Sequence, residues 1–143
     1  PHLSPARQHP WLYVPCQNTN NVYVLDRFTL AEETVLDVPG AHGAGMTRNG
    51  KIFYTTNLTG GGTDALWAID TRTNTLVGEP VDAPYPVPHN IALAGSGNTV
   101  FVTHSGPTSD KVTVYRNLGN TPMPSFAAEV TVGLNPFGLT YVD

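Results

Sequence analysis

A segment of about 45 residues recurs along this chain, and it constrains the fold more than any other feature. Each repeat opens with a histidine or an asparagine just ahead of a short apolar run, and the openers start at His2, His42, His89 and Asn135. Two further runs of alternating apolar residues follow each of the first three openers. Repeats of this length form architectures in which each unit buries its faces only against its neighbours.

The middle repeat indicates most clearly how many strands one unit holds. The alternation of apolar and polar residues predicts strands over 42–47, 51–57, 65–70 and 75–81. Arg48, Asn49 and Gly50 separate the first two strands, and an Asn-Gly pair favours a tight hairpin. In the third repeat the same alternation predicts strands over 89–94, 99–104, 111–115 and 127–132. In the first repeat it predicts strands from Leu3 onward and over 11–16, 21–26 and 33–38.

Four antiparallel strands per repeat are typical of β-propeller blades. The sequence therefore predicts an all-β chain with three blades over residues 1–39, 40–86 and 87–133, and the first strand of a further blade over 134–143. Because a closed propeller has about 4 to 8 blades, we expect a partial ring. The open edges of such a ring imply partners, which would be other blades of a larger protein or further copies of this chain.

The composition fits short strands joined by frequent turns, with 14 Gly and 13 Pro. Seven Lys and Arg stand against 11 Asp and Glu, and the net charge of -4 offers no basic surface for nucleic acid. No run approaches the roughly 18 apolar residues of a membrane helix, so no membrane span is predicted. Cys16 is the single cysteine and is interpreted as a partly buried, small apolar side chain.

The opening histidines are the candidate functional residues. In a propeller the first strand of each blade lines the central channel, so His2, His42 and His89 are expected to converge at one rim. The second strand ends at the same rim and places His104 one step further out. Imidazoles brought together in this way ligate copper, zinc or iron, and a cluster of histidines alone suits copper best. A structural role, in which these histidines hydrogen-bond to a neighbouring blade, stays open.

Asn135 and His9 are the remaining positions to compare with the opening histidines. Asn135 is expected to take the place of the histidine at the fourth opener, and His9 is expected to be exposed in the first turn. Asn57, Leu58 and Thr59 form an acceptor sequence for N-glycosylation, which matters only in a eukaryotic secretory protein.

The stretch LYVPCQNTNNVYVLD resembles the propellers of surface layers and the periplasm that are named for their YVTN repeat. This resemblance extends over essentially the whole chain and implies an extracytoplasmic protein, whether periplasmic, on the cell surface or secreted. The openers PHLSP, AHGAG and PHNIA are similar to the Pro-His-Gly blade starts of nitrous oxide reductase and thiocyanate dehydrogenase. In those propellers such histidines bind a multinuclear copper centre. The second resemblance implies copper as cofactor with His2, His42 and His89 as ligands, while His104 matches by location only.

Catalytic residues cannot be assigned, because the sequence has no Cys-x-x-Cys, His-Glu-x-x-His, P-loop or Gly-x-Ser-x-Gly motif. Three functions remain open at this point. The first is a ligand- or metal-binding scaffold with a histidine-lined channel rim. The second is a part of a copper-dependent oxidoreductase, and the third is a structural module of a surface layer or assembly.

Overall fold

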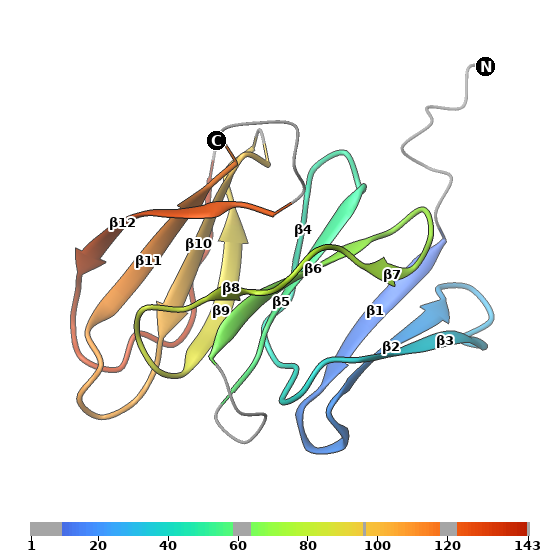
Figure 1. Ribbon diagram of the computed structural model, residues 1–143, viewed down its shortest axis with the longest axis horizontal. Coiled ribbons are helices and arrows are strands. Elements are labelled where there is room, and N and C mark those ends of the chain that lie inside the picture. Colours follow the sequence, from blue (N-terminus) through green and yellow to red (C-terminus); the bar gives the residue numbers. More distant parts are fainter. Residues whose placement is uncertain (1–9, 59–63, 96, 118–122, 143) are drawn as a thin grey trace.

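The computed structural model describes residues 10–58, 64–95, 97–117 and 123–142. Within these ranges the chain forms three antiparallel β-sheets that stand side by side, as Figure 1 shows, and one short 3-10 turn at Gln17–Thr19. The predicted all-β fold, a partial β-propeller, is confirmed. None of the described helical segments is long and apolar enough to cross a bilayer. The strand expected from Leu3 onward lies outside the described residues, as do His2 and His9.

Each sheet holds strands that follow one another in the sequence. The first sheet has the order β1 (Trp11–Cys16), β2 (Asn21–Asp26), β3 (Glu32–Asp37). The second has the order β4 (Gly45–Met46), β5 (Ile52–Thr56), β6 (Ala65–Asp70), β7 (Thr75–Leu76), and β8 (Val81–Asp82) also pairs with β6. The third has the order β9 (Pro88–Leu93), β10 (Thr99–His104), β11 (Lys111–Arg116), β12 (Ser125–Thr131). We refer to these sheets as blades 1, 2 and 3.

Blade 2 departs from the sequence prediction at both of its edges. The strand predicted over 75–81 is divided into β7 and β8, because Gly78 has a positive φ of 60° and Pro80 has no N–H to donate to a ladder. The strand predicted over 42–47 is reduced to β4 and an isolated bridge between Ala41 and Asn57. The hairpin predicted at Asn49 and Gly50 is present, and Gly50 has the expected positive φ of 68°.

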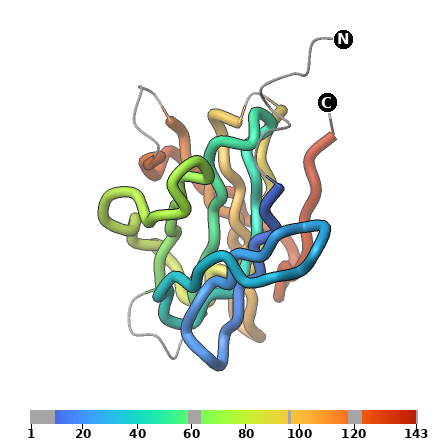
Figure 2. The backbone as a smooth tube through the Cα atoms, turned by 90° about the vertical axis from the view of Figure 1, so that its right-hand side faces the viewer, coloured from blue at the N-terminus to red at the C-terminus, as the bar shows by residue number. Residues whose placement is uncertain are grey.

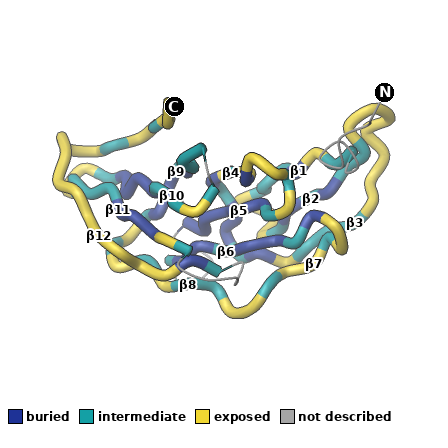
Figure 3. The backbone as a smooth tube through the Cα atoms, turned by 90° about the horizontal axis from the view of Figure 1, so that it is seen from above, coloured by how far each residue is buried: buried dark blue, intermediate teal, exposed yellow. Residues whose placement is uncertain are grey.

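The core consists of two apolar layers, one on each side of blade 2. Between blades 1 and 2 the buried side chains are Tyr13, Val22, Val24, Val38, Ala41, Phe53 and Ile69. Between blades 2 and 3 they are Tyr54, Leu66, Ala68, Ile91, Val100, Val102 and Tyr115. Successive residues of a strand point to opposite faces, so Phe53 packs toward blade 1 and Tyr54 toward blade 3. Figure 3 shows the result, with the middle of the molecule buried and the outer strands exposed.

Glycine allows blades 2 and 3 to approach closely at their inner edge. A Cβ atom at Gly45 would lie 2.6 Å from side-chain carbons of both Ile91 and Leu93. A Cβ atom at Gly43 would collide with the carbonyl oxygen of His89 and the hydroxyl of Thr56. This approach brings the openers of the two blades into direct contact.

Candidate functional site

His42 and His89, the openers of blades 2 and 3, lie against each other as the sequence predicted. Their ring centroids are 4.3 Å apart and their planes are tilted by 57°. Phe137 continues this arrangement on the other side of His89, with centroids 4.1 Å apart. His89 is 7% exposed, His42 is half-buried, and Phe137 is 61% exposed. We call these three residues the rim column.

The rim column is uncharged near neutral pH. Burial lowers the pKa of His42 below its ordinary value. Burial also lowers the pKa of His89, and the neighbouring charge of a protonated His42 lowers it further. Two imidazoles in contact therefore resist protonation, because one positive charge disfavours the next. The column offers ring faces and nitrogen atoms rather than positive charge.

Threonines at the ends of the second strands hold each opener in place. The backbone N–H of Gly43 donates to Thr56 Oγ1 at 2.9 Å, and Thr56 Oγ1 donates to the carbonyl oxygen of His89 at 2.9 Å. One hydroxyl thus connects the opener of its own blade to the opener of the next. This role was not predicted from the sequence, although the polar strand ends Tyr-Thr-Thr-Asn and Val-Thr-His recur in it.

The same connection in blade 3 corrects the alignment of the fourth opener. The N–H of Asn90 donates to Thr103 Oγ1 at 3.1 Å, and this hydroxyl donates to the carbonyl oxygen of Phe137 at 3.0 Å. Phe137 therefore takes the position of His89, and the expectation that Asn135 takes it is wrong. Asn135 instead has a positive φ of 55°, and its side-chain oxygen accepts from the N–H of Gly106 at 2.8 Å.

Asn90 determines which nitrogen of His89 carries the proton. Its side-chain nitrogen donates to the carbonyl oxygen of Phe137 at 2.8 Å and lies 3.0 Å from His89 Nδ1. Since an amide nitrogen can only donate, Nδ1 must accept, and the proton of the neutral ring is on Nε2. His89 therefore presents an N–H donor at Nε2.

His104 lies apart from the rim column, inside blade 3. It is fully buried, with Nδ1 3.1 Å from the carbonyl oxygen of Pro86 and Nε2 2.9 Å from Thr113 Oγ1. Because a carbonyl can only accept, Nδ1 carries the proton and Nε2 accepts from the threonine. Burial lowers the pKa of His104 as well. Both of its nitrogens are thus engaged within the blade.

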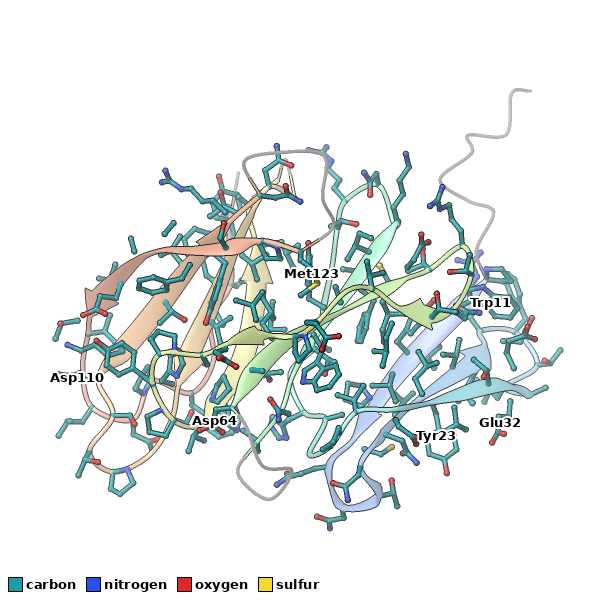
Figure 4. The ribbon with its side chains drawn as sticks, viewed as in Figure 1. Trp11, Tyr23, Glu32, Asp64, Asp110 and Met123 are labelled. Atoms are coloured by element: carbon teal, nitrogen blue, oxygen red, sulfur yellow. The ribbon has the colours of Figure 1, made fainter. Side chains whose placement is uncertain are left out.

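A recess of about 250 Å³ opens beside His104. Its lining comprises Tyr85, Pro86, His104, Thr108, Ser109, Asp110 and Lys111. Asp110 is labelled in Figure 4, and its carboxylate lies 3.3 Å from the ammonium of Lys111. The charges in the recess are therefore paired with each other.

Among the described residues, the two imidazoles that lie together and could bind a metal are those of His42 and His89. Among residues 10–58, 64–95, 97–117 and 123–142, no group of three His, Cys, Asp or Glu side chains could hold a metal ion. A copper centre of several ions does not fit this donor set without ligands from elsewhere. Cys16 is half-buried, in agreement with the interpretation from sequence, and its thiol donates to the carbonyl oxygen of Val14 at 3.5 Å.

The acceptor residue of the glycosylation sequence is buried. Asn57 is 2% exposed, and its side-chain oxygen accepts from the N–H of Ala65 at 2.6 Å. A side chain held in this way between two strands is inaccessible to an oligosaccharide. Thr59, the third residue of this sequence, lies outside the described residues.

No family model and no curated protein matches this sequence. Solved structures do match it. Hydrazine synthase of Kuenenia stuttgartiensis has a TM-score of 0.76 and 17% identity, over 89% of this chain and 34% of that one. A putative 6-phosphogluconolactonase from Bacteroides uniformis has a TM-score of 0.70 and 15% identity, over 88% of this chain and 38% of that one. The dihydro-heme d1 dehydrogenase NirN has a TM-score of 0.66 and 16% identity, over 85% of this chain and 24% of that one.

These likenesses show a shared β-propeller-like fold. The chain spans between 24% and 38% of the length of these three structures, which agrees with three blades of a larger ring. At such low identity they carry no activity across, since one fold hosts many unrelated functions.

Proposed function

We propose that this chain is part of a β-propeller scaffold, extracytoplasmic, whose channel rim binds a small planar ligand through the rim column. The observation that carries the proposal is the continuous contact of His42, His89 and Phe137, in which the last ring is 61% exposed. Exposed aromatic faces stack on flat ligands, and binding sites combine such faces with a few polar groups of fixed direction.

Asn90 supplies that fixed direction. It keeps Nε2 of His89 protonated, so a ligand acceptor at the rim would meet a donor without any rearrangement of the ring. In His104, by contrast, both nitrogens bond to groups of the protein. The contrast between the two histidines supports a binding role for the rim column.

The test is a titration of the 15N-labelled chain with planar heterocyclic fragments such as purines and pteridines, observed through the histidine ring signals. We expect the signals of His42 and His89 to shift and those of His104 to stay unchanged. Phe137→Ala should weaken binding about fivefold, because stacking on one ring contributes about 1 kcal/mol. Exposed Phe28 offers a matched control, so Phe28→Ala should leave binding unchanged. Equal shifts at all three histidines would contradict the proposal.

Copper binding is a second candidate, favoured by the contact between the His42 and His89 rings. Bound copper would supply redox chemistry, and His42 and His89 would be the ligands contributed by the described residues. His89 could ligate through Nε2 only if its proton moved to Nδ1, against the amide of Asn90. Elemental analysis of chain purified without chelators tests this. Stoichiometric copper that is lost in His42→Ala would support it, and a metal-free chain would refute it.

A further inference from the structure

The connection that leads from blade 2 into blade 3, residues 83–87, is held in a strained conformation. Figure 2 shows the yellow-green part of the chain just before it, with β7 and β8, standing out from the side of the sheets. Val87 has a positive φ of 54°, although it is β-branched and precedes a proline, two features that disfavour this conformation. Its carbonyl oxygen accepts from the N–H of Ser105 at 3.1 Å, and the carbonyl oxygen of Pro86 accepts from His104 Nδ1 at 3.1 Å. Strain of this kind persists where surrounding contacts hold it, and it is frequent at binding sites.

Tyr85, in the same connection, is fixed against blade 3. Its ring meets the ring of His104 edge to face, with centroids 5.6 Å apart and planes at 74°. Its hydroxyl donates to Glu129 Oε2 on β12 at 2.5 Å. The ring is thus held along its edge and at its tip, and with Pro86 it forms one wall of the recess beside His104. A wall that is already in place costs a ligand no ordering of side chains.

The opposite wall of the recess is polar. It comes from the end of the connection between β10 and β11 and comprises Thr108, Ser109, Asp110 and Lys111. The ammonium of Lys111 donates to Thr131 Oγ1 at 2.7 Å and lies 3.3 Å from the carboxylate of Asp110. Because an ammonium has three N–H donors, these two contacts leave one donor for a ligand.

The two walls together match a ring that carries hydroxyl groups. Asp110 and Lys111 present an acceptor and a donor side by side. Since a hydroxyl both donates and accepts, two adjacent hydroxyls of a ligand can bond to this pair and leave neither charge without a partner. Tyr85 and Pro86 offer apolar surface on the other side, where the C–H groups of such a ring can pack.

Negative charge prevails around the recess in the described part of the chain. Figure 4 labels Asp110 and, on the blade 2 side, Asp64, whose charge acts on His104. The hydrogen bond to Glu129 raises the pKa of Tyr85, and burial and the charges of Glu129 and Asp110 raise it further. The phenol therefore stays protonated near neutral pH, and an anionic ligand would be repelled.

We propose that the recess binds the ring of a neutral sugar with adjacent free hydroxyl groups. Its volume of about 250 Å³ is below the roughly 300–1,000 Å³ of sites for drug-sized molecules, so it takes a single ring. Tyr85 and Pro86 contact the C–H face of the sugar, and Asp110 and Lys111 bond to neighbouring hydroxyls. This is a second site, separate from the rim column, and the two sites fail or succeed independently.

Titration of the 15N-labelled chain with D-glucose, D-galactose and D-mannose tests the proposal. For at least one of these sugars we expect the amide signals of Tyr85, Ser109 and Lys111 to shift, with a dissociation constant of about 1 mM for a ligand of about 12 non-hydrogen atoms. The ring signals of His42 should stay unchanged. The matching uronate, the same ring with a carboxylate, should bind at least about tenfold more weakly. No shift with any of the three sugars up to about 100 mM, or equal binding of sugar and uronate, would overturn the proposal. A response to ethanolamine but to no sugar would assign the recess to cations and refute it as well.

Substitutions in the two walls locate the site. Lys111→Met keeps the length of the side chain but removes the ammonium, and it should weaken sugar binding about tenfold. Lys51→Met, at an exposed lysine in the turn before β5, is the matched control and should leave binding unchanged. Tyr85→Ala should weaken binding about fivefold, whereas Tyr85→Phe keeps the ring and should weaken it less. Equal effects of Lys111→Met and Lys51→Met, or unchanged binding in Tyr85→Ala, would show that the sugar does not occupy the recess.

Discussion

His89 and His104 lie at the start and the end of neighbouring strands of one blade, yet their ring nitrogens have different partners. Pro88 pairs with His104 in the ladder, so the two histidines lie within a few residues of each other. In His104 both nitrogens bond to protein groups, and the proton is on Nδ1. In His89 an amide occupies Nδ1, and the proton is on Nε2. The histidines that recur at the openers, His42 and His89, lie at the rim, whereas His104, at the end of a strand, joins parts of its own blade.

The largest effect is expected from removing His104. His104→Ala leaves a cavity and also leaves the carbonyl of Pro86 and the hydroxyl of Thr113 without this partner, so the free energy of unfolding should fall by about 3 kcal/mol. His42→Ala, at the half-buried rim, should cost about 1 kcal/mol. Urea unfolding followed by circular dichroism measures both. Equal losses would show that the two positions are equally structural and would break the comparison.

An intermediate effect is expected at the threonine that connects the openers. Thr103→Val keeps the shape but removes the hydrogen bonds to Asn90 N–H and to the Phe137 carbonyl, which should cost about 1–2 kcal/mol. Thr103→Ser keeps the hydroxyl and is the matched control, and it should recover most of the loss. If Ser destabilises the chain and Val does not, the methyl group rather than the hydrogen bonds holds the opener.

Sequence alone predicted most strands of this chain because alternation and turn residues are local signals. The strands at 11–16, 21–26, 65–70 and 99–104 have the predicted bounds. The division of the strand predicted over 75–81 was missed because the positive φ of Gly78 outweighs the β-propensity of its neighbours. The sequence prediction placed Asn135 rather than Phe137 at the fourth opener because it followed the repeat spacing and not the strand register. That register depends on hydrogen bonds between blades, which no local pattern encodes.

The contact of His42 and His89 could be predicted because propeller geometry brings equivalent positions together. The position of His104 apart from the rim column could not be predicted, since it depends on the direction in which its side chain projects from β10. Its partners, Pro86 and Thr113, come from a preceding loop and the next strand. Which residues would bind a metal also depends on the direction of their side chains. Metal binding by His2, which lies outside the described residues, stays a prediction.

The smallest effect is expected from a change of pH, measured as the free energy of unfolding. Burial lowers the pKa of His42, His89 and His104 in the folded chain, so the unfolded chain, with histidine pKa values of about 6.5, takes up protons first as the pH falls. The free energy of unfolding should therefore be constant above about pH 6.5 and decline below it. His42→Gln should reduce this decline, because it removes one such group and also relieves His89 of a neighbouring charge.

Long-range 15N–1H spectra above pH 6.5 should show the proton of His89 on Nε2 and that of His104 on Nδ1. Finding both histidines in one tautomer would mean that Asn90 does not orient the rim, and the distinction between the two sites would be lost.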